Sequence, residues 1–416
     1  MNYKKINAAF AAGIACLCPN VLPTANADTT VPADYYNYDA GATYPVTVTE
    51  QRSTPAFRLS EVTYPSPVDT GYPANDLVKA YFYDPTTPGP HPVVIVYHEW
   101  LPKNLKLDES LCERLANVGI AALMVIEPFS QNRRPLPHVP EAELLTPIVP
   151  RMVRNLRQSI VDGRRGLDWV LTQPNIDSNH VGVAGISLGA MLAALYAGAE
   201  PRVSLIVSLD GGADISDIIW NSPMTHALRV KIARQGIDYS QFQDLIAPVE
   251  PKTWIKEFDP KNAFLVNGRY DLIVRPDQAV RLGSILGGAR VVWMNTGHYG
   301  LALGEAQISD VGVHFLKERF AGKDDVRLPS TLKSGTIEVG LLLGRPEYIT
   351  PALSYHLFNF DEAGRFAITG QLGLHGPAVA GAVRLSNVVS VGMRWPVSLS
   401  HGRWKEEPFI LVHAVL

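Results

Sequence analysis

The feature that most constrains the fold is a serine between two glycines, placed where a predicted strand changes into a predicted helix. The strand covers residues 181–184, a G-x-S-x-G turn covers 185–189, and small and apolar residues continue in helical spacing. This strand-turn-helix context is what makes the motif specific. The turn exposes Ser187, and the first N–H groups of the helix can stabilise negative charge there. The segment predicts Ser187 as a nucleophile; the alternative is a serine in an ordinary Gly-rich turn.

Around this motif, apolar runs typical of buried strands alternate with segments of helical periodicity. Strands are predicted at 92–97, 121–126, 180–184, 203–209, 263–266 and 290–294, and helices at 107–118, 153–172, 188–199, 276–286 and 308–320. Strands and helices that alternate in this way indicate an α/β protein whose parallel sheet is covered on both faces. We therefore expect an α/β-hydrolase fold with a mostly parallel central sheet over residues 61–325. Within it, 214–260 is a candidate cap or lid.

A serine nucleophile needs a base, and in this fold the partners follow the serine in the order acid, then histidine. Asp271 lies in a loop just after the strand 263–266, and His298 lies in the corresponding loop after 290–294. Asp210, directly after 203–209, is the alternative acid, although Asp followed by Gly is also typical of a turn. Asp271 is favoured because it precedes the histidine by a single strand-helix unit. The predicted catalytic residues are Ser187, Asp271 and His298.

The first 27 residues have the pattern of a secretory signal peptide. Lys4 and Lys5 precede a short apolar run at 8–17, and Ala-Asn-Ala at 25–27 fits a cleavage site. A membrane anchor would need about 20 apolar residues, which this run does not provide. The sequence therefore predicts export to the periplasm or the exterior. Cleavage would leave Cys112 as the single cysteine, so no intramolecular disulfide is expected.

The two segments that flank the α/β region have different patterns. Residues 28–60, rich in Tyr, Thr, Pro and Ala, are expected to be irregular. Residues 326–416 are expected to form a separate β-rich module that the chemistry does not need; the clearest strand is 366–372. Such alternation also occurs in outer-membrane barrels, but about six candidate strands are fewer than the eight of the smallest single-chain barrels. A small β-module is therefore favoured, with membrane or partner association as the alternative.

Composition and motifs exclude several other functions. The chain of 416 residues is 46% hydrophobic and 19% charged, with a formal net charge of −3. This apolar content is too high for a disordered protein, and the charge gives no reason to expect nucleic acid as a partner. The sequence contains no phosphate-cradling Gly-rich loop, H-E-x-x-H motif or paired-cysteine motif, so neither a cofactor nor a metal is expected.

The loop after the strand 92–97 adds a family resemblance. It begins His98-Glu99-Trp100, and together with the serine turn and the Asp and His loops, in this order, it resembles the dienelactone hydrolase family over roughly residues 75–320. The family's nucleophile is typically cysteine, whereas this chain has Ser187. A serine at this position suits ester substrates and is similar to the elbow of acetyl-ester and polyester-cleaving α/β-hydrolases.

The resemblance implies further site residues and an activity. The backbone N–H groups of Trp100 and Leu188 would form the oxyanion hole, and Glu99 would lie beside the nucleophile; alternatively, Glu99 is a polar loop residue that caps the next helix. The expected protein is an exported serine hydrolase that cleaves small-molecule or polymeric carboxylic esters through an acyl-enzyme. The alternatives are a peptidase or amidase on the same fold, or a non-catalytic binding protein of the cell envelope.

Overall fold

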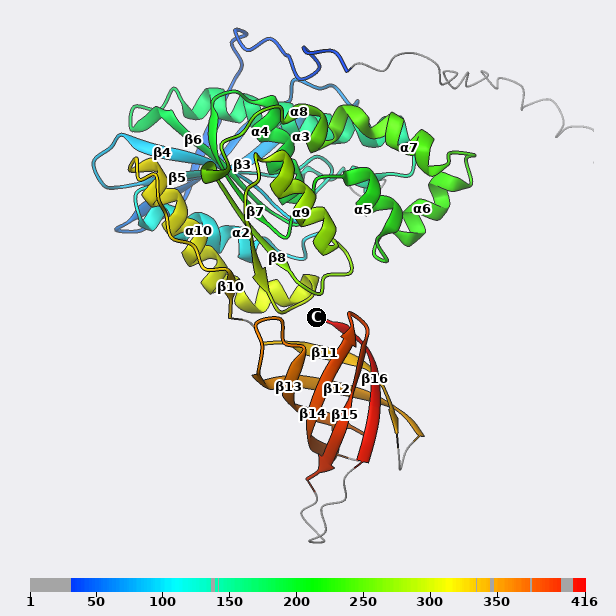
Figure 1. The fold of residues 1–416 in the computed structure, drawn as a ribbon. Helices are drawn as coiled ribbons and strands as arrows, with labels where there is room; N and C mark the ends of the chain where they lie inside the picture. Colours follow the sequence, from blue (N-terminus) through cyan, green and yellow to red (C-terminus); the bar gives the residue numbers. More distant parts are fainter. Residues whose placement is uncertain are drawn as a thin grey trace, which may run out of the picture.

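The computed structural model describes residues 31–135, 139–140, 142–333, 335–344, 348–374, 376–397 and 407–416. The predicted signal peptide lies outside these residues. The described chain forms an α/β domain built on a ten-stranded sheet, followed by a closed β-barrel (Figure 1). Within the described residues, no helix is long and apolar enough to cross a membrane.

The sheet of the α/β domain is antiparallel at one edge and parallel elsewhere. Its strand order is β1-β2-β3-β5-β4-β6-β7-β8-β9-β10. The antiparallel strands are β1 (Thr47–Ser53), β2 (Phe57–Pro65) and β3 (Leu77–Pro85). The parallel strands are β4 (His91–Tyr97), β5 (Ala121–Val125), β6 (Ile176–Ile186), β7 (Val203–Leu209), β8 (Ala263–Gly268), β9 (Val291–Met294) and β10 (Thr331–Leu332). The predicted α/β class and mostly parallel sheet are confirmed.

Helices cover both faces of the sheet because the central strands are apolar on both sides. On β4, Val93 and Ile95 join the core on one face, whereas Val94 joins the core on the other. The first core also contains α3 (Val149–Val170), α4 (Leu188–Ala199) and α9 (Pro276–Ile285), and the second contains α2 (Lys106–Asn117) and α10 (Glu305–Phe320). Parallel strands buried on both faces are expected to be continuously apolar, as these are.

The candidate lid segment 214–260 is mostly helical. It contains α5 (Ile215–Asn221), α6 (His226–Ala233), α7 (Tyr239–Ile246) and α8 (Pro251–Trp254), while the short α1 (Pro73–Asp76) precedes β3. Helix α7 packs on α3, and α8 packs on α4. The segment therefore adds to the helical layer on the α3–α4 side of the sheet (Figure 1).

Two predicted boundaries need correction. Residues 28–60 are not irregular throughout, because β1 and the start of β2 form an antiparallel hairpin there. Strand β1 is exposed along its whole length, so it has no apolar alternation that would reveal it. The α/β domain also extends beyond residue 325, since β10 pairs with β9. A strand of two residues is too short to give a recognisable pattern.

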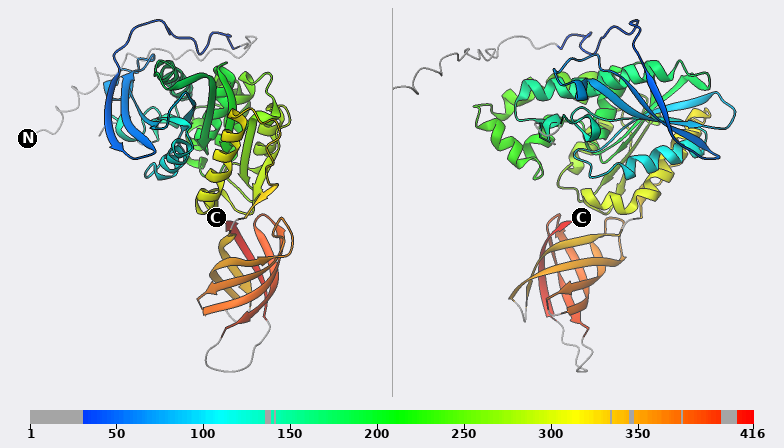
Figure 2. Two further views of the ribbon diagram at one scale, coloured as in Figure 1. Left: turned by 90° about the vertical axis from the view of Figure 1, so that its left-hand side faces the viewer. Right: turned by 180° about the vertical axis from the view of Figure 1, so that it is seen from behind.

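The C-terminal module is the predicted β-rich unit. Its strands are β11 (Ile337–Gly344), β12 (Tyr348–Asn359), β13 (Phe366–Gly373), β14 (Gly376–Ser386), β15 (Val389–Pro396) and β16 (Glu407–Val415). Each strand pairs antiparallel with the next, and β16 pairs with β11 to close the barrel. Both views in Figure 2 show the barrel standing clear of the α/β domain except at one end.

Candidate active site

Ser187 occupies the single position between β6 and α4, in a strained backbone conformation. Its φ is 54°, in the left-handed region that non-glycine residues adopt only when the surrounding structure enforces it. The two glycines of the motif make this possible. A Cβ on Gly185 would overlap the Gly189 carbonyl, and one on Gly189 would overlap the Tyr97 carbonyl and lie 2.6 Å from that of His98. The motif therefore serves both the turn and the close approach of α4 to the end of β4.

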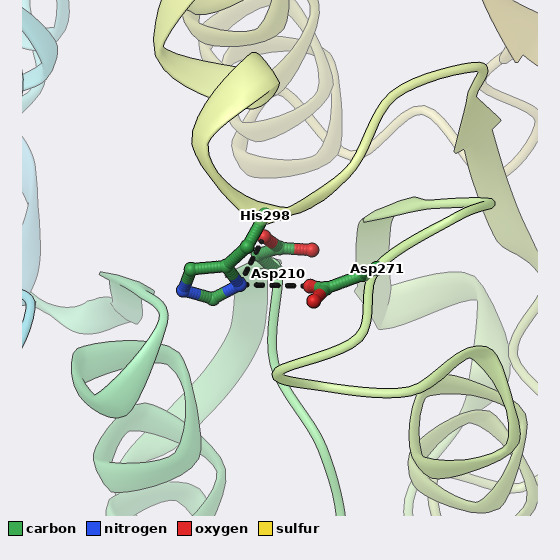
Figure 3. A group of neighbouring side chains, drawn as sticks. All are labelled: Asp210, Asp271 and His298. Carbon is green, nitrogen blue, oxygen red and sulfur yellow. Dashed lines mark hydrogen bonds and ion pairs between the residues drawn. The ribbon is translucent and has the colours of Figure 1, made fainter. Parts of the chain in front are cut away.

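His298 links this serine to two carboxylates. Its Nε2 lies 2.9 Å from Ser187 Oγ. Its Nδ1 lies 2.7 Å from Asp271 Oδ2 and 2.8 Å from Asp210 Oδ2, as Figure 3 shows. His298 begins the short 3₁₀ segment η5 (His298–Gly304) after β9, whereas Asp271 follows β8 and Asp210 follows β7. The structure thus brings together all three predicted catalytic residues and the alternative acid.

The two carboxylates are held differently. Asp271 Oδ1 accepts the backbone N–H groups of Ile273 at 2.6 Å and Val274 at 3.0 Å. Asp210 Oδ1 accepts longer bonds, from Gly268 N at 3.2 Å and from the Asn267 side-chain amide at 3.4 Å. Short bonds from backbone N–H groups favour the charged form of a carboxylate. Asp271 is therefore the better-fixed anion of the two.

The electrostatics of the cluster follow from burial and from the closeness of like charges. Burial, together with the nearby Asp271 carboxylate, raises the pKa of Asp210 to about 7. Burial alone would lower the pKa of His298, but Asp210 and Asp271 outweigh it and raise that pKa well above the usual value. The pKa values of Asp210 and His298 are therefore both raised, and the two groups face each other at 2.8 Å.

The same three side chains are the one group in the described chain whose donor atoms could surround a metal ion. One ligand atom from each of Asp210, Asp271 and His298 lies within 4.8 Å of the others. The histidine atom nearest the carboxylates, Nδ1, is already hydrogen-bonded to Asp271 and lies at ion-pair distance from Asp210. A cation there would have to displace the proton that holds the cluster together. The arrangement is better suited to proton transfer than to metal binding.

The loop after β4 lies against the start of α4, as the predicted oxyanion hole requires. The contact is made by Gly189 with the carbonyls of Tyr97 and His98. Neither the N–H of Leu188 nor that of Trp100 donates to an acceptor within the described ranges. The first N–H groups of a helix have no intrahelical acceptor, so the Leu188 N–H is available to a ligand.

Glu99 lies close to two buried carboxyl groups, those of Asp108 on α2 and of Glu127 after β5. Burial, and then the Glu99 charge, raise the pKa of Asp108 well above its usual value. Burial, and then the Glu99 charge, likewise raise the pKa of Glu127. Glu99 is therefore one of three neighbouring carboxyl groups, and its place beside the nucleophile stays a prediction.

The rim of the barrel contacts the loops that carry Asp271 and His298. Sequence reasoning missed these contacts. Thr296 Oγ1 and Gly297 N donate to the Leu416 carbonyl at 2.5 and 2.9 Å, just before His298. The Thr336 hydroxyl donates to the Asn295 carbonyl at 2.5 Å. On the other loop, the Tyr270 hydroxyl donates to the carbonyl of Ala363, and the Arg384 guanidinium lies 3.8 Å from the Tyr270 ring centre.

These contacts correct the expectation that the module is separate from the site. Four of these five contacts involve a backbone atom on at least one side, so no residue pattern could have revealed them. Two cavities of about 360 Å³ lie along the same junction, one beside Trp293 and Glu362 and the other beside Arg365, with Arg269 in both. Neither is lined by Ser187 or His298.

We expect a Gly297→Ala substitution to lower kcat more than tenfold. The new Cβ would overlap the Val415 carbonyl at the end of β16, so the loop would have to move together with His298. Steady-state kinetics on a small ester measure the effect. Gly370→Ala is the matched control, because its Cβ meets only ordinary contacts at 3.7 Å or more. Equal kcat values for both variants would show that the rim does not position the histidine.

Comparison with known proteins gives a family match over part of the chain. Residues 78–237 match the model of the Dienelactone hydrolase family, which confirms the predicted resemblance and the α/β-hydrolase fold and supports an ester hydrolase. The match includes Ser187 and Asp210 and ends before Asp271 and His298. No curated protein sequence matches the chain.

Solved structures with a similar fold include three esterases. An acetyl xylan esterase from Paenibacillus sp. R4 is 18% identical, with a TM-score of 0.48 over 66% of this chain and 89% of its own. Acetyl xylan esterase 1 from Thermoanaerobacterium sp. JW/SL YS485 is 17% identical, with a TM-score of 0.49 over 68% and 92%. An esterase from Pyrobaculum calidifontis is 21% identical, with a TM-score of 0.41 over 63% and 85%. Likenesses at this level carry no information about substrate.

Proposed function

We propose that this protein, whose residues 78–237 match the dienelactone hydrolase family, is an exported serine hydrolase that cleaves carboxylic esters. One observation carries the proposal: a continuous hydrogen-bonded chain from Ser187 Oγ through His298 to Asp271. The serine stands in a strained turn at the start of a helix, where its oxygen can reach a substrate carbonyl. An aligned serine, histidine and carboxylate is the arrangement that activates a hydroxyl for acyl transfer.

The geometry supports a two-step reaction. His298 Nε2 takes the proton of Ser187 as the serine oxygen attacks the ester carbonyl carbon, and Asp271 stabilises the imidazolium that forms. The N–H groups of Leu188 and Trp100 hold the oxyanion of the tetrahedral intermediate. The intermediate collapses when the carbon–oxygen bond to the alcohol breaks and His298 protonates the leaving oxygen. Water, deprotonated by His298, then attacks the acyl carbon, and the bond from that carbon to Ser187 Oγ breaks as His298 returns the proton to the serine oxygen, which releases the acid.

Labelling with a fluorophosphonate tests the nucleophile, and a series of 4-nitrophenyl esters of increasing acyl length then defines the substrate. We expect the wild-type protein to be labelled once, at Ser187, and to turn over at least one ester of the series. Labelling at another serine, or no labelling of a folded protein, would contradict the proposal. Export is proposed from the first 27 residues, and recovery of a mature protein that still begins at Met1 would contradict it.

The pH dependence should reveal the second carboxylate. Activity requires a neutral His298, so kcat/KM should rise with pH, with a midpoint above the ordinary histidine value of about 6.5. The charge of Asp210 favours the imidazolium, so Asp210→Asn should move the midpoint to lower pH and raise relative activity near pH 6. Profiles from pH 5 to 9 with an uncharged ester measure this. An unchanged or more alkaline midpoint would show that Asp210 does not act on the histidine.

A further inference from the structure

The barrel has most of its polar residues inside and a surface of apolar residues outside. On β12, the buried positions are Thr350, Ala352, Ser354 and His356, whereas the alternate positions Ile349, Leu353 and Leu357 are exposed. A strand of a water-soluble barrel shows the opposite arrangement, because its large apolar side chains fill the core. The strand is therefore inverted relative to a soluble fold.

The apolar exterior extends around the whole circumference. One exposed apolar side chain from each of five strands illustrates it: Leu341 on β11, Leu353 on β12, Ile368 on β13, Leu385 on β14 and Ile410 on β16. The outward residues of β15 are apolar and half-buried. Across the described strands β11–β16, no outward-facing position carries a charged side chain. We call this continuous surface the apolar wall.

The interior contains a cluster of buried polar side chains. Glu338 accepts from Arg384 at 2.6 Å and lies 3.1 Å from His356, and all three side chains are buried. Ser390 contacts His413 at 3.0 Å. Five further inward positions are alanines, at 352, 367, 378, 380 and 382. Leu342, Phe409 and Leu411 pack with three of these alanines in a small apolar cluster inside the barrel. A barrel of few strands has a narrow interior, which these mostly small residues fill.

We propose that the apolar wall is embedded in the hydrocarbon core of a phospholipid bilayer. The strands described as β11–β16 have 8 to 12 residues. A tilted strand needs about 9–11 residues to cross the hydrocarbon core. Aromatic residues stand at both ends of the wall: Phe358, Phe360 and Phe366 at the end near the α/β domain, and Tyr348 and Trp395 at the other. Aromatic side chains in this position are typical of the two membrane interfaces.

A bilayer fits the wall better than a protein partner does. A second copy or another protein would cover one side of the barrel, yet the wall is apolar on every strand. Lipid surrounds a barrel completely, and closure leaves no strand edge with unpaired backbone groups in the hydrocarbon. The favoured sequence-based interpretation, a small water-soluble module, rested on the number of strands. The structure adds the inverted side-chain arrangement and the closure on which the present proposal rests.

Vesicle flotation of the full-length protein tests the proposal. Detergent-purified protein is reconstituted with vesicles of phosphatidylcholine and phosphatidylglycerol, centrifuged on a density gradient, and washed with carbonate at high pH. We expect the wild-type protein to float and to remain after the wash. The double variant L353R/V412R, with an arginine in the wall on β12 and on β16, should float about tenfold less or worse, since arginine is strongly disfavoured in hydrocarbon. Val280→Arg, at an exposed apolar position of α9, should float like wild type.

The readouts separate lipid from other occupants and from misfolding. Circular dichroism and fluorophosphonate labelling in detergent confirm that each variant is folded; if L353R/V412R does not fold, Ile368→Arg replaces it. Wild-type protein that stays in the aqueous fraction without detergent, as a monodisperse species, would overturn the proposal. So would a soluble oligomer that the wall arginines convert to monomers, because the wall would then be an interface between copies. Equal flotation of the double variant and wild type would also overturn it.

Discussion

Replacement of Ser187 by alanine should lower kcat for ester hydrolysis by about 10⁶-fold. The reason is that His298 Nε2, 2.9 Å from Ser187 Oγ, would activate this oxygen as the proposed nucleophile. Alanine removes the oxygen that would form the acyl-enzyme, and the strained backbone of the turn is unaffected by the loss of one polar atom. The measurement is a steady-state or single-turnover assay with an activated ester, together with fluorophosphonate labelling.

Ser284→Ala is the matched control for this experiment. Ser284 lies exposed on α9, and its hydroxyl donates only to the Val280 carbonyl of its own helix. The control should retain wild-type kcat, labelling and melting temperature. If Ser187→Ala kept more than a tenth of the wild-type rate, the turn would not be the active site, and the hydrogen-bonded chain would need another explanation.

Asp271→Asn should lower kcat by about 10⁴-fold, whereas Asp210→Asn should cost less than tenfold at the optimal pH. An amide cannot serve as the anionic acceptor of the histidine Nδ1–H, so the imidazole loses both its tautomer and the charge that stabilises it. The two variants differ in consequence because Asp271 is the carboxylate fixed by short backbone bonds, at 2.6 and 3.0 Å. Asp210 is held by longer bonds, at 3.2 and 3.4 Å, so its replacement by asparagine should disturb the orientation of His298 less.

The ranking of the variants decides the role of each acid. A larger loss for Asp210→Asn would make Asp210 the orienting acid and Asp271 the auxiliary one. Small losses in both single variants, with a large loss in the double variant, would mean that the two carboxylates replace one another. Asp177→Asn, which removes a half-buried carboxylate paired with His180 at the opposite end of β6 from the turn, controls for a general change in net charge.

The sequence predicted the frame of the site because each part rests on a local physical requirement. A strand covered on both faces must be continuously apolar, and the apolar run at 92–97, which forms most of β4, meets this requirement. The serine turn needs glycines on both sides, and the overlaps that a Cβ at Gly185 or Gly189 would make show why. Loops at the carboxyl ends of parallel strands meet at one edge, so Asp271 and His298 could be placed together without any knowledge of distances.

Other features depend on contacts that leave no trace in local patterns. Asp210 and Asp271 both follow strands, and only the coordinates show that His298 Nδ1 contacts both at nearly equal distance. The exposed strand β1 and the short strand β10 lack any periodic signal. The alternation of residues 366–372 indicated a half-buried strand, but which face would be buried depended on closure of the barrel, a relation between distant strands.

The junction between barrel and catalytic loops has a consequence for the order of folding. Strand β16 lies later in the sequence than every catalytic residue, and the residue after it, Leu416, provides the carbonyl that receives Thr296 and Gly297. During synthesis, the loop that carries His298 therefore emerges well before the strand that braces it. A nascent or partly assembled chain would contain the serine, the acids and the histidine, and yet remain a poor catalyst until β16 closes on β11. The enzyme would then mature when its barrel is complete, and turnover would begin only after the barrel has assembled.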